Sequence, residues 1–267
     1  MDLFTDDPMA RPLTYPGRIP AASGVLLDDA YVPLRADGDP DGWRAGEETL
    51  ATLLAREGGE ELAARHRVVA VGSNAAPSQL RRKFLDHRVR PFVPMTVAEV
   101  RGVAPGVSAH VSRWGYVPAA PIETPGETSR LFVLWLDEHQ LAALDLTEPN
   151  YRRRPLADPV TLESGTRLPP PYVYEGRHGC LATGDGRAHP RRLTSQRTLI
   201  QSLLDGSAAL RHLCGNTPDE FVDNVRDDTV REAAYRLLQA ECRVRPGSGR
   251  GSGKGPGNGS GPGDAAG

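Results

Sequence analysis

The distribution of apolar residues predicts strands in the middle of the chain and helices toward both ends. The most continuous apolar run covers residues 130–136, and its lack of polar alternation predicts a central strand. A second run at 68–71 predicts a buried strand that stops at the tight turn Gly72-Ser73-Asn74. Strand-like patterns also cover 89–120, 154–162 and 172–174.

Apolar residues spaced three and four positions apart predict helices. One such pattern covers 42–64 and is interrupted at Gly58-Gly59. Pro77 suits the first position of a helix that follows the Gly-Ser-Asn turn. Two further helices are predicted at 194–204 and 218–242.

A capping pattern marks the start of the helix that follows the central strand. Gln140 stands three residues after Asp137, which predicts reciprocal hydrogen bonds at the helix N-terminus. The helix must end near Glu148, because Pro149 disfavours helical geometry in the residue before it.

Composition divides the chain into four segments. Residues 1–65 form an N-terminal arm and helix, 66–190 form a folded domain, and 191–245 form a helical extension. Residues 246–267 alternate Gly with polar residues and bury nothing, so a disordered Gly-rich tail is predicted there.

Charge and cysteine content exclude several classes of protein. The formal net charge is -2, so neither nucleic acid nor a membrane surface is expected as a partner. No stretch of about 18 apolar residues occurs, and the acidic start lacks the pattern of a secretory signal. The three cysteines form no CxxC pair, so neither a disulfide framework nor a metal site is predicted. A reducing cytoplasm is the expected location, and the preference for Arg over Lys is typical of a GC-rich bacterial genome.

Gly72-Ser73-Asn74 is the first candidate for chemistry. Backbone N–H groups in a loop between a strand and a helix can bind an anion or an oxyanion, and glycine permits close approach. The competing interpretation is an ordinary strand-to-helix turn in which Asn74 bonds its own backbone. On spacing alone, the ordinary turn is the commoner outcome.

Glu148, at the predicted helix end, is the second candidate. The partial negative charge of a helix C-terminus disfavours a carboxylate, which suits a group that acts first as base and then as acid. The alternative is a surface glutamate that pairs with one of the arginines at 152–154.

Trp114-Gly115-Tyr116 is the third candidate, either as an apolar wall of a pocket or as a packed strand and turn. Other groups offer less. Ser73 lies in no GxSxG motif, and His178-Gly179-Cys180 has no partner that would make a thiol nucleophile or a metal site.

These segments together resemble the γ-glutamylcyclotransferase-like superfamily. The family's strand and Gly-Ser-Asn loop correspond to 68–75, its later strand to 131–136, and its L-D-x-x-E helix end to 144–148. Tyr151 begins the Y-x-R that often follows, and 172–174 matches the closing strand. Three positions depart from the family pattern: Val71 replaces tyrosine, Ala75 replaces leucine, and Pro149-Asn150 replaces a glycine.

The resemblance implies a fold and a reaction. The fold would be mixed α/β, a small β-barrel with flanking helices, followed here by the helical C-terminal extension. The reaction would cyclise a γ-glutamyl amide or amine to 5-oxoproline, with no metal or organic cofactor. Glu148 would be the general acid and base. The substrate-binding residues would be Gly72, Ser73, Asn74, Trp114 and Tyr151.

Three interpretations of function remain open. An enzyme requires Glu148 to face a cavity near the 72–74 loop. A non-catalytic module that binds a small molecule or a protein could instead hold Glu148 in a surface ion pair with Arg152 or Arg153. A structural adaptor would work through its C-terminal helices. The expected partner is a small γ-glutamyl or related amide, and the extensions could also form a homodimer surface.

Overall fold

A computed structural model describes residues 2–38, 42–183 and 189–241; the predicted tail and Cys242 lie outside these ranges. The helices of the described residues are α1 (Leu50–Arg56), α2 (Pro77–Asp86), α3 (Glu138–Thr147), α4 (Gln196–Gly206), α5 (Ala208–Cys214), α6 (Pro218–Asn224) and α7 (Asp228–Glu241), with short 3-10 turns η1 (Pro12–Thr14), η2 (Leu62–Ala64) and η3 (Ser73–Ala75). The strands are β1 (Gly24–Leu27), β2 (Ala30–Ala36), β3 (Trp43–Ala45), β4 (Glu48–Thr49), β5 (His66–Ala70), β6 (Phe92–Val107), β7 (Ala119–Leu136), β8 (Tyr151–Pro155), β9 (Val160–Leu162), β10 (Arg167–Leu168) and β11 (Tyr172–Gly176).

The strands form one mostly antiparallel sheet with the order β4-β3-β2-β1-β6-β7-β5-β11-β8. The prediction that 130–136 is central is confirmed, because β7 pairs with β6 on one side and β5 on the other. β5 and β11 are parallel neighbours, and β8 pairs with β11. The chain that follows Glu148 therefore enters the sheet two strands away from β5, whose end carries the Gly-Ser-Asn loop.

The mixed α/β class is confirmed, but a closed barrel is not supported because the sheet is open. β4 and β8 form the two ends of the strand path and do not pair with each other. The long β6–β7 hairpin curves past a register shift between Arg101 and Gly102. A bulge of this kind bends a strand pair and increases its twist, which produces curvature without closure.

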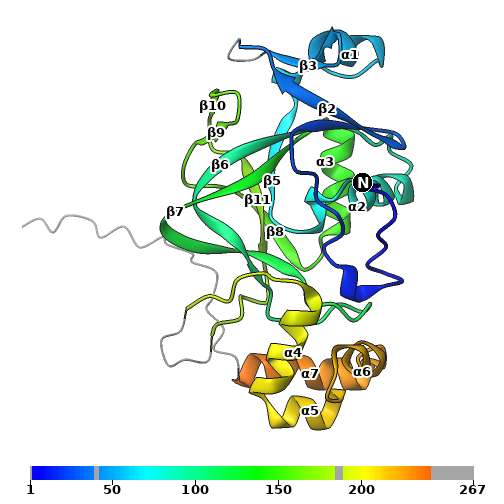
Figure 1. Cartoon of the computed structure of the whole chain (residues 1–267), viewed down its shortest axis with the longest axis vertical. Coiled ribbons are helices and arrows are strands. Elements are labelled where there is room, and N and C mark those ends of the chain that lie inside the picture. The colour runs from blue at the N-terminus through cyan, green and yellow to red at the C-terminus, as the bar shows by residue number, and fades with distance from the viewer. Residues whose placement is uncertain (1, 39–41, 184–188, 242–267) are drawn as a thin grey trace, which may run out of the picture.

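Side chains of β5 alternate between the two faces of the sheet. Val68 packs in one buried cluster with Leu80 of α2 and Leu144 of α3. Val69 packs in the opposite cluster with Trp135 of β7. Leu80 and Leu144 are both 0% exposed, and burial of a leucine contributes about 2 kcal/mol. α2 and α3 are thereby fixed side by side on one face of the sheet (Figure 1), which sets the positions of the residues at their ends.

The region before β5 differs from the predicted helix at 42–64. Only α1 and η2 are helical, because Trp43 and Ala45 lie in β3 and extend the β1–β2 hairpin. Both side chains are buried in the core on the Trp135 side of the sheet, so burial outweighs the helical spacing of the apolar residues. The break predicted at Gly58-Gly59 is present, and Gly58 has a φ of 71 after the end of α1.

The C-terminal extension contains four helices, and they lie together at one end of the molecule (Figure 1). The predicted second helix is divided at Val225, where α6 ends before α7 begins. α5 was not predicted, although Ser207 caps it by accepting a hydrogen bond from the Leu210 N–H. No helix of the described residues is long and apolar enough to cross a membrane.

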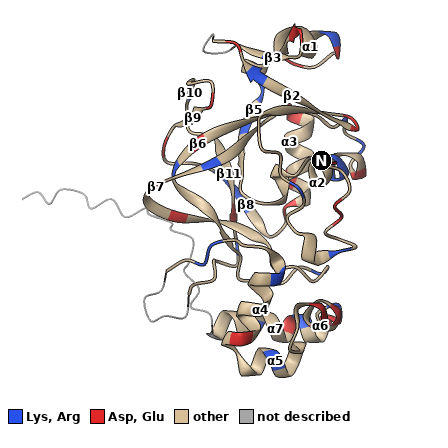
Figure 2. Cartoon of the chain, in the orientation of Figure 1, with Lys and Arg blue, Asp and Glu red and all other residues tan. Residues whose placement is uncertain are grey.

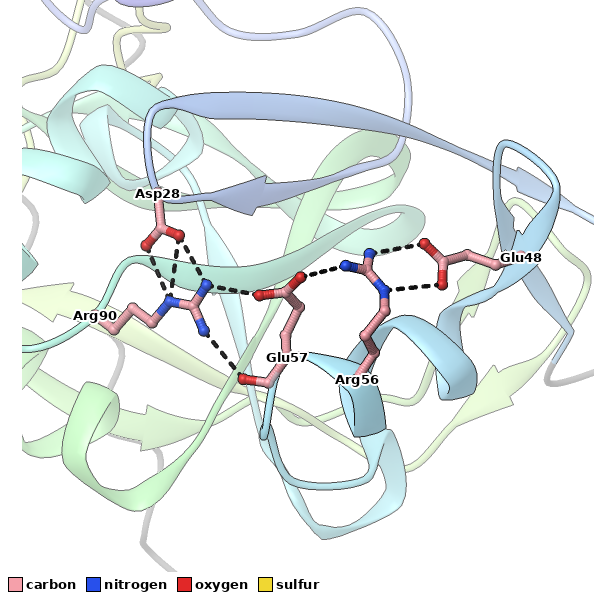
Figure 3. Close-up of polar contacts among 5 residues, drawn as sticks. All are labelled: Asp28, Glu48, Arg56, Glu57 and Arg90. Atoms are coloured by element: carbon pink, nitrogen blue, oxygen red, sulfur yellow. Dashed lines mark hydrogen bonds and ion pairs between the residues drawn. The ribbon is translucent and has the colours of Figure 1, made fainter.

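A chain of ion pairs joins the N-terminal hairpin to the rest of the fold (Figure 3). Arg90 binds Asp28 and Glu57, each at 2.8 Å. Arg56 continues the chain, from Glu57 at 2.7 Å to Glu48 at 2.9 Å. Basic and acidic residues are spread over the sheet and the C-terminal helices alike (Figure 2).

Candidate functional site

The Gly72-Ser73-Asn74 loop connects β5 to α2, and Gly72 lies close to Ala119 and Tyr15. A Cβ built on Gly72 would lie 2.7 Å from the Ala119 Cβ and 2.9 Å from the Tyr15 Oη. Gly72 has a φ of -141, so glycine is required here for space and not for a left-handed conformation. Pro77 begins α2 directly after the loop, as predicted.

α3 presents Glu148 at its C-terminal cap. The predicted capping box of Asp137 and Gln140 is present, and the helix ends at Thr147 as Pro149 requires. Asp145 fixes this end of the helix to the sheet, because it accepts hydrogen bonds from Arg153 at 3.0 Å and from the Tyr174 hydroxyl at 2.7 Å.

Glu148 lies inside the molecule against the Gly-Ser-Asn loop. Its Oε1 accepts hydrogen bonds from the Asn74 Nδ2 at 3.0 Å and from the Lys83 Nζ at 2.5 Å. The Lys83 Nζ also donates to the Asn74 Oδ1 at 2.7 Å, which closes a triangle of three side chains. The side chains of Glu148 and Lys83 are each 10% exposed.

The surface ion pair that the sequence allowed for Glu148 is not formed. Arg152 pairs with Glu175 at 3.0 Å, and Arg154 pairs with the same carboxylate at 2.9 Å. Arg153 pairs with Asp145. Every arginine at 152–154 therefore has another carboxylate. Both side-chain contacts of Glu148 within the described residues use Oε1, which leaves Oε2 as the oxygen that a bound molecule would meet.

Three tyrosines enclose the space beside Glu148. The Tyr151 hydroxyl donates to the Ala119 carbonyl at 2.7 Å, and the Ala119 N–H donates to the Tyr15 hydroxyl at 2.9 Å. Burial raises the pKa of Tyr15, Tyr151 and Tyr174, and the Glu148 carboxylate adds to each effect. These phenols therefore stay protonated and can act as neutral hydrogen-bonding groups.

A cavity of about 30 Å³ lies among these groups. Its lining residues are Tyr15, Val69, Ala70, Val71, Gly72, Ser73, Asn74, Ala119, Glu148, Tyr151 and Tyr174. A second cavity of about 270 Å³ shares Ala70 and Val71 with the first and is lined mainly by apolar side chains. Arg130 is its charged lining residue, and residues 19–21 of the N-terminal arm form part of its wall.

Most of the sequence-predicted site residues meet at the smaller cavity. Gly72, Ser73, Asn74, Glu148 and Tyr151 line it together. Trp114 does not: it lies in a turn at 112–115, not on a strand, with the Arg113 guanidinium 4.6 Å from the centre of its ring.

Sequence reasoning missed Lys83, Tyr15 and Tyr174. The sequence contained one signal for Lys83. It is one of only two lysines in a chain rich in arginine, and it lies on the predicted helix that follows Asn74. Tyr15 and Tyr174 had none, because nothing in the sequence connects an N-terminal arm or a closing strand to Glu148. The described residues contain no group of three or more His, Cys, Asp or Glu that could hold a metal ion.

No protein-family model matches the chain, and no curated protein matches it. Among solved structures, the chain is similar to a γ-glutamyl cyclotransferase, with 19% identity, a TM-score of 0.33, and coverage of 42% of this chain and 66% of that one. It spans just under two thirds of the length of that protein.

Two further solved structures are similar to the chain. An Arabidopsis thaliana protein studied in solution is 13% identical, with a TM-score of 0.35 and coverage of 70% of this chain and 95% of that one. An uncharacterized protein from Homo sapiens is 14% identical, with a TM-score of 0.35 and coverage of 71% and 93%. One of these three solved structures bears the name of the family that the sequence resembles.

Proposed function

We propose that this protein is a γ-glutamylcyclotransferase-like enzyme that converts a γ-glutamyl amide to 5-oxoproline and a free amine. The observation that supports this most is the position of Glu148. Its carboxylate is buried against Asn74 of the Gly-Ser-Asn loop and beside a cavity, although three arginines that could have held it at the surface lie close by in the sequence. Buried carboxylates in a cavity are typical of functional sites.

Glu148 would act in both halves of the reaction. As a carboxylate it takes a proton from the substrate α-ammonium, and the freed amine attacks the γ-carbonyl carbon. The five-membered ring closes as the bond to the leaving nitrogen breaks, and Glu148 returns its proton to that nitrogen. The attacking nitrogen gives up two protons in all, and the released amine leaves as an ammonium ion that carries both.

The loop would bind the substrate, whose ammonium group would displace Lys83 from Glu148. Backbone N–H groups of Gly72, Ser73 and Asn74 would bind the substrate carboxylate or the developing oxyanion. In the resting site, the Lys83 ammonium contacts both Glu148 and Asn74, as a substrate ammonium would. Holding the amine against the γ-carbonyl converts ring closure into a favoured intramolecular step, which can contribute several kcal/mol.

The released amine would occupy the second cavity. The smaller cavity, at about 30 Å³, has room for little more than one water molecule, whereas ligand pockets typically measure about 300–1,000 Å³. The neighbouring cavity of about 270 Å³ begins at the same two residues, Ala70 and Val71, and offers mostly apolar walls. We therefore expect amides with an apolar amine side chain to be preferred, and we place the reaction in the cytoplasm.

One observation favours a second candidate, a binding module without turnover. The Lys83 ammonium already holds the Glu148 carboxylate in an ion pair at 2.5 Å. If no substrate displaces Lys83, the carboxylate cannot act as a base. The protein would then bind a small molecule at the Gly-Ser-Asn loop without converting it.

The test is release of 5-oxoproline from γ-glutamyl amides whose amine is ammonia, glycine, leucine or phenylalanine. We expect Glu148→Gln to lower the rate at least ~100-fold, because the amide cannot exchange a proton. The variant should still fold and unfold cooperatively, although at lower stability, because Lys83 loses its carboxylate partner. Glu57→Gln, a matched change in the ion-pair chain of Figure 3, should keep the wild-type rate. A Glu148→Gln protein that retains the wild-type rate would contradict the proposed role. Binding of these amides without release would establish the second candidate.

A further inference from the structure

The N-terminal arm places a tyrosine inside the candidate site. Tyr15 is only 6% exposed, and its hydroxyl oxygen accepts a hydrogen bond from the Ala119 N–H at 2.9 Å. The same oxygen lies 2.9 Å from the position that a Cβ on Gly72 would take. The Tyr15 side chain thus fills the space beside the Gly-Ser-Asn loop, about 130 residues before Glu148 in the sequence.

The Ala119 N–H donates a hydrogen bond to this oxygen, and the Ser73 backbone lies close enough to affect the pKa of the phenol. Ala119 begins β7, and Ser73 begins η3. Burial raises the pKa of Tyr15, whereas hydrogen bonds from the backbones of Ala119 and Ser73 oppose that rise. Donors that stabilise negative charge on a phenol oxygen would stabilise it equally on a carboxylate or carbonyl oxygen.

The C-terminal helices hold the arm in this position. η1, which directly precedes Tyr15, contacts α4 and α6. The Tyr15 ring stacks on Tyr116 with a centroid distance of 4.3 Å. The loop that carries Tyr116 is fixed in turn by Gln196 of α4, whose amide exchanges two hydrogen bonds of 2.9 Å with the Val117 backbone. Helical extension, arm and site therefore form one connected unit (Figure 1).

We propose that the Tyr15 hydroxyl occupies the subsite for an oxygen of the γ-glutamyl group, and that substrate binds by displacing the Tyr15 side chain. This inference rests on the proposed function. It assigns the Ala119 N–H, together with the Ser73 backbone, to recognition of a carboxylate or carbonyl oxygen. It also explains the size of the cavity beside Glu148, which cannot admit a γ-glutamyl group while Tyr15 is in place.

Substrate can bind only those molecules in which the Tyr15 side chain has moved out of the subsite. The apparent affinity is therefore the intrinsic affinity multiplied by the fraction of such molecules. Removing the occupant should therefore tighten binding. We expect Tyr15→Ala to lower KM for γ-glutamyl amides, and the Kd of 5-oxoproline measured by calorimetry, by about tenfold. Tyr15→Phe keeps the packing and loses only the hydroxyl, so its KM should lie between those of Tyr15→Ala and the wild type.

Tyr31→Ala is the matched control. Tyr31 also lies in the N-terminal region with its hydroxyl bonded to a backbone carbonyl, that of Ala22, but it lines neither cavity. Its KM and Kd should equal those of the wild type. If the variants turn over substrate but neither Tyr15 variant lowers KM, Tyr15 is not displaced by substrate, and the proposed function still holds. The same conclusion follows if both variants lower kcat at an unchanged KM. If every variant is folded but none turns over substrate or binds 5-oxoproline, both the proposed function and the displacement of Tyr15 are contradicted.

Discussion

Two clusters of charged side chains in this molecule differ in what surrounds them. The chain from Asp28 to Glu48 contains two arginines, each shared by two carboxylates (Figure 3), and its side chains are 19–55% exposed. The Lys83–Glu148 pair has one cation, one carboxylate and the amide of Asn74. Asp28 and Arg90 are 50% and 45% exposed, against 10% for each member of the buried pair.

The number of ion pairs therefore does not identify the candidate site. Exposed pairs join elements and contribute little each, because water screens both partners. A buried pair carries a large cost of desolvation, and the fold retains it only where its geometry is good or its charge has a use. The cavity beside Glu148 indicates a use for the buried charge.

Removing Lys83 is the strongest test of this contrast. Lys83→Met would leave Glu148 without its cation in a site that is largely closed to water. We expect the free energy of unfolding at pH 7, measured in urea, to fall by about 2–4 kcal/mol. Because the cause is an uncompensated carboxylate, the double variant Lys83→Met with Glu148→Gln should recover part of that loss.

Arg56→Met supplies the comparison from the exposed chain. It also removes a cation shared with carboxylates, Glu48 and Glu57, but Arg56 itself is 55% exposed and Glu57 keeps its second cation, Arg90. We expect no measurable change in the urea midpoint. Equal losses for Lys83→Met and Arg56→Met would show that burial does not distinguish the two clusters.

A buried group without a charged partner sharpens the comparison. The His110 ring packs edge to face against the Tyr151 ring, with 6.5 Å between their centroids, and its Nδ1 forms a hydrogen bond of 2.7 Å with the Ser108 hydroxyl. The His178 ring lies 4.4 Å from it, centroid to centroid. Burial, with a smaller effect of His178, lowers the pKa of His110 to about 3. Below pH 6.5 the unfolded chain therefore binds a proton at this position that the folded protein does not, and stability falls as pH falls.

The expected loss from His110 is about 2 kcal/mol between pH 7 and pH 5, since each pKa unit corresponds to about 1.4 kcal/mol. Urea unfolding at several pH values would measure it. His110→Asn should flatten this part of the profile. A variant that kept the wild-type slope would assign the loss to other groups, of which His178, whose pKa is also lowered by burial, is the first to examine.

Local signals in the sequence predicted the parts of the site that depend on neighbouring residues. The capping box, the helix end at Glu148 and the turn after β5 all follow from contacts within four residues or from the geometry of proline. Lys83 and Glu148 are 65 residues apart, and Tyr15 and Ala119 are 104 apart. No local pattern encodes such contacts, because they arise only when the sheet brings β5, β7 and the end of α3 together.

The segments around Trp43 and Trp114 were wrongly predicted for different reasons. Trp43 was included in a predicted helix because of the apolar spacing at 42–64. Instead, β3 pairs with β2, and this pairing places the Trp43 side chain in the buried core. Trp114 was expected on a strand, whereas its segment is a turn whose backbone N–H groups bond the Ser112 hydroxyl. At Trp43 a tertiary contact outweighed a short pattern of apolar residues, whereas at Trp114 local hydrogen bonds to Ser112 formed a turn.

The smallest measurable effect is expected at Asp28. Hydrogen bonding to Arg90 lowers the pKa of this aspartate below 3.8, so the pair contributes stability above that pH and loses it as pH falls through the lower folded value. Asp28 has a φ of 51 in the β1–β2 turn, a conformation that asparagine also tolerates, so Asp28→Asn removes the charge and keeps the turn. The expected loss is under about 1 kcal/mol at pH 7, smaller still in 1 M salt, and absent once the wild-type carboxyl is protonated. A loss as large as that of Lys83→Met, or one that salt does not reduce, would contradict the distinction between the exposed and the buried cluster.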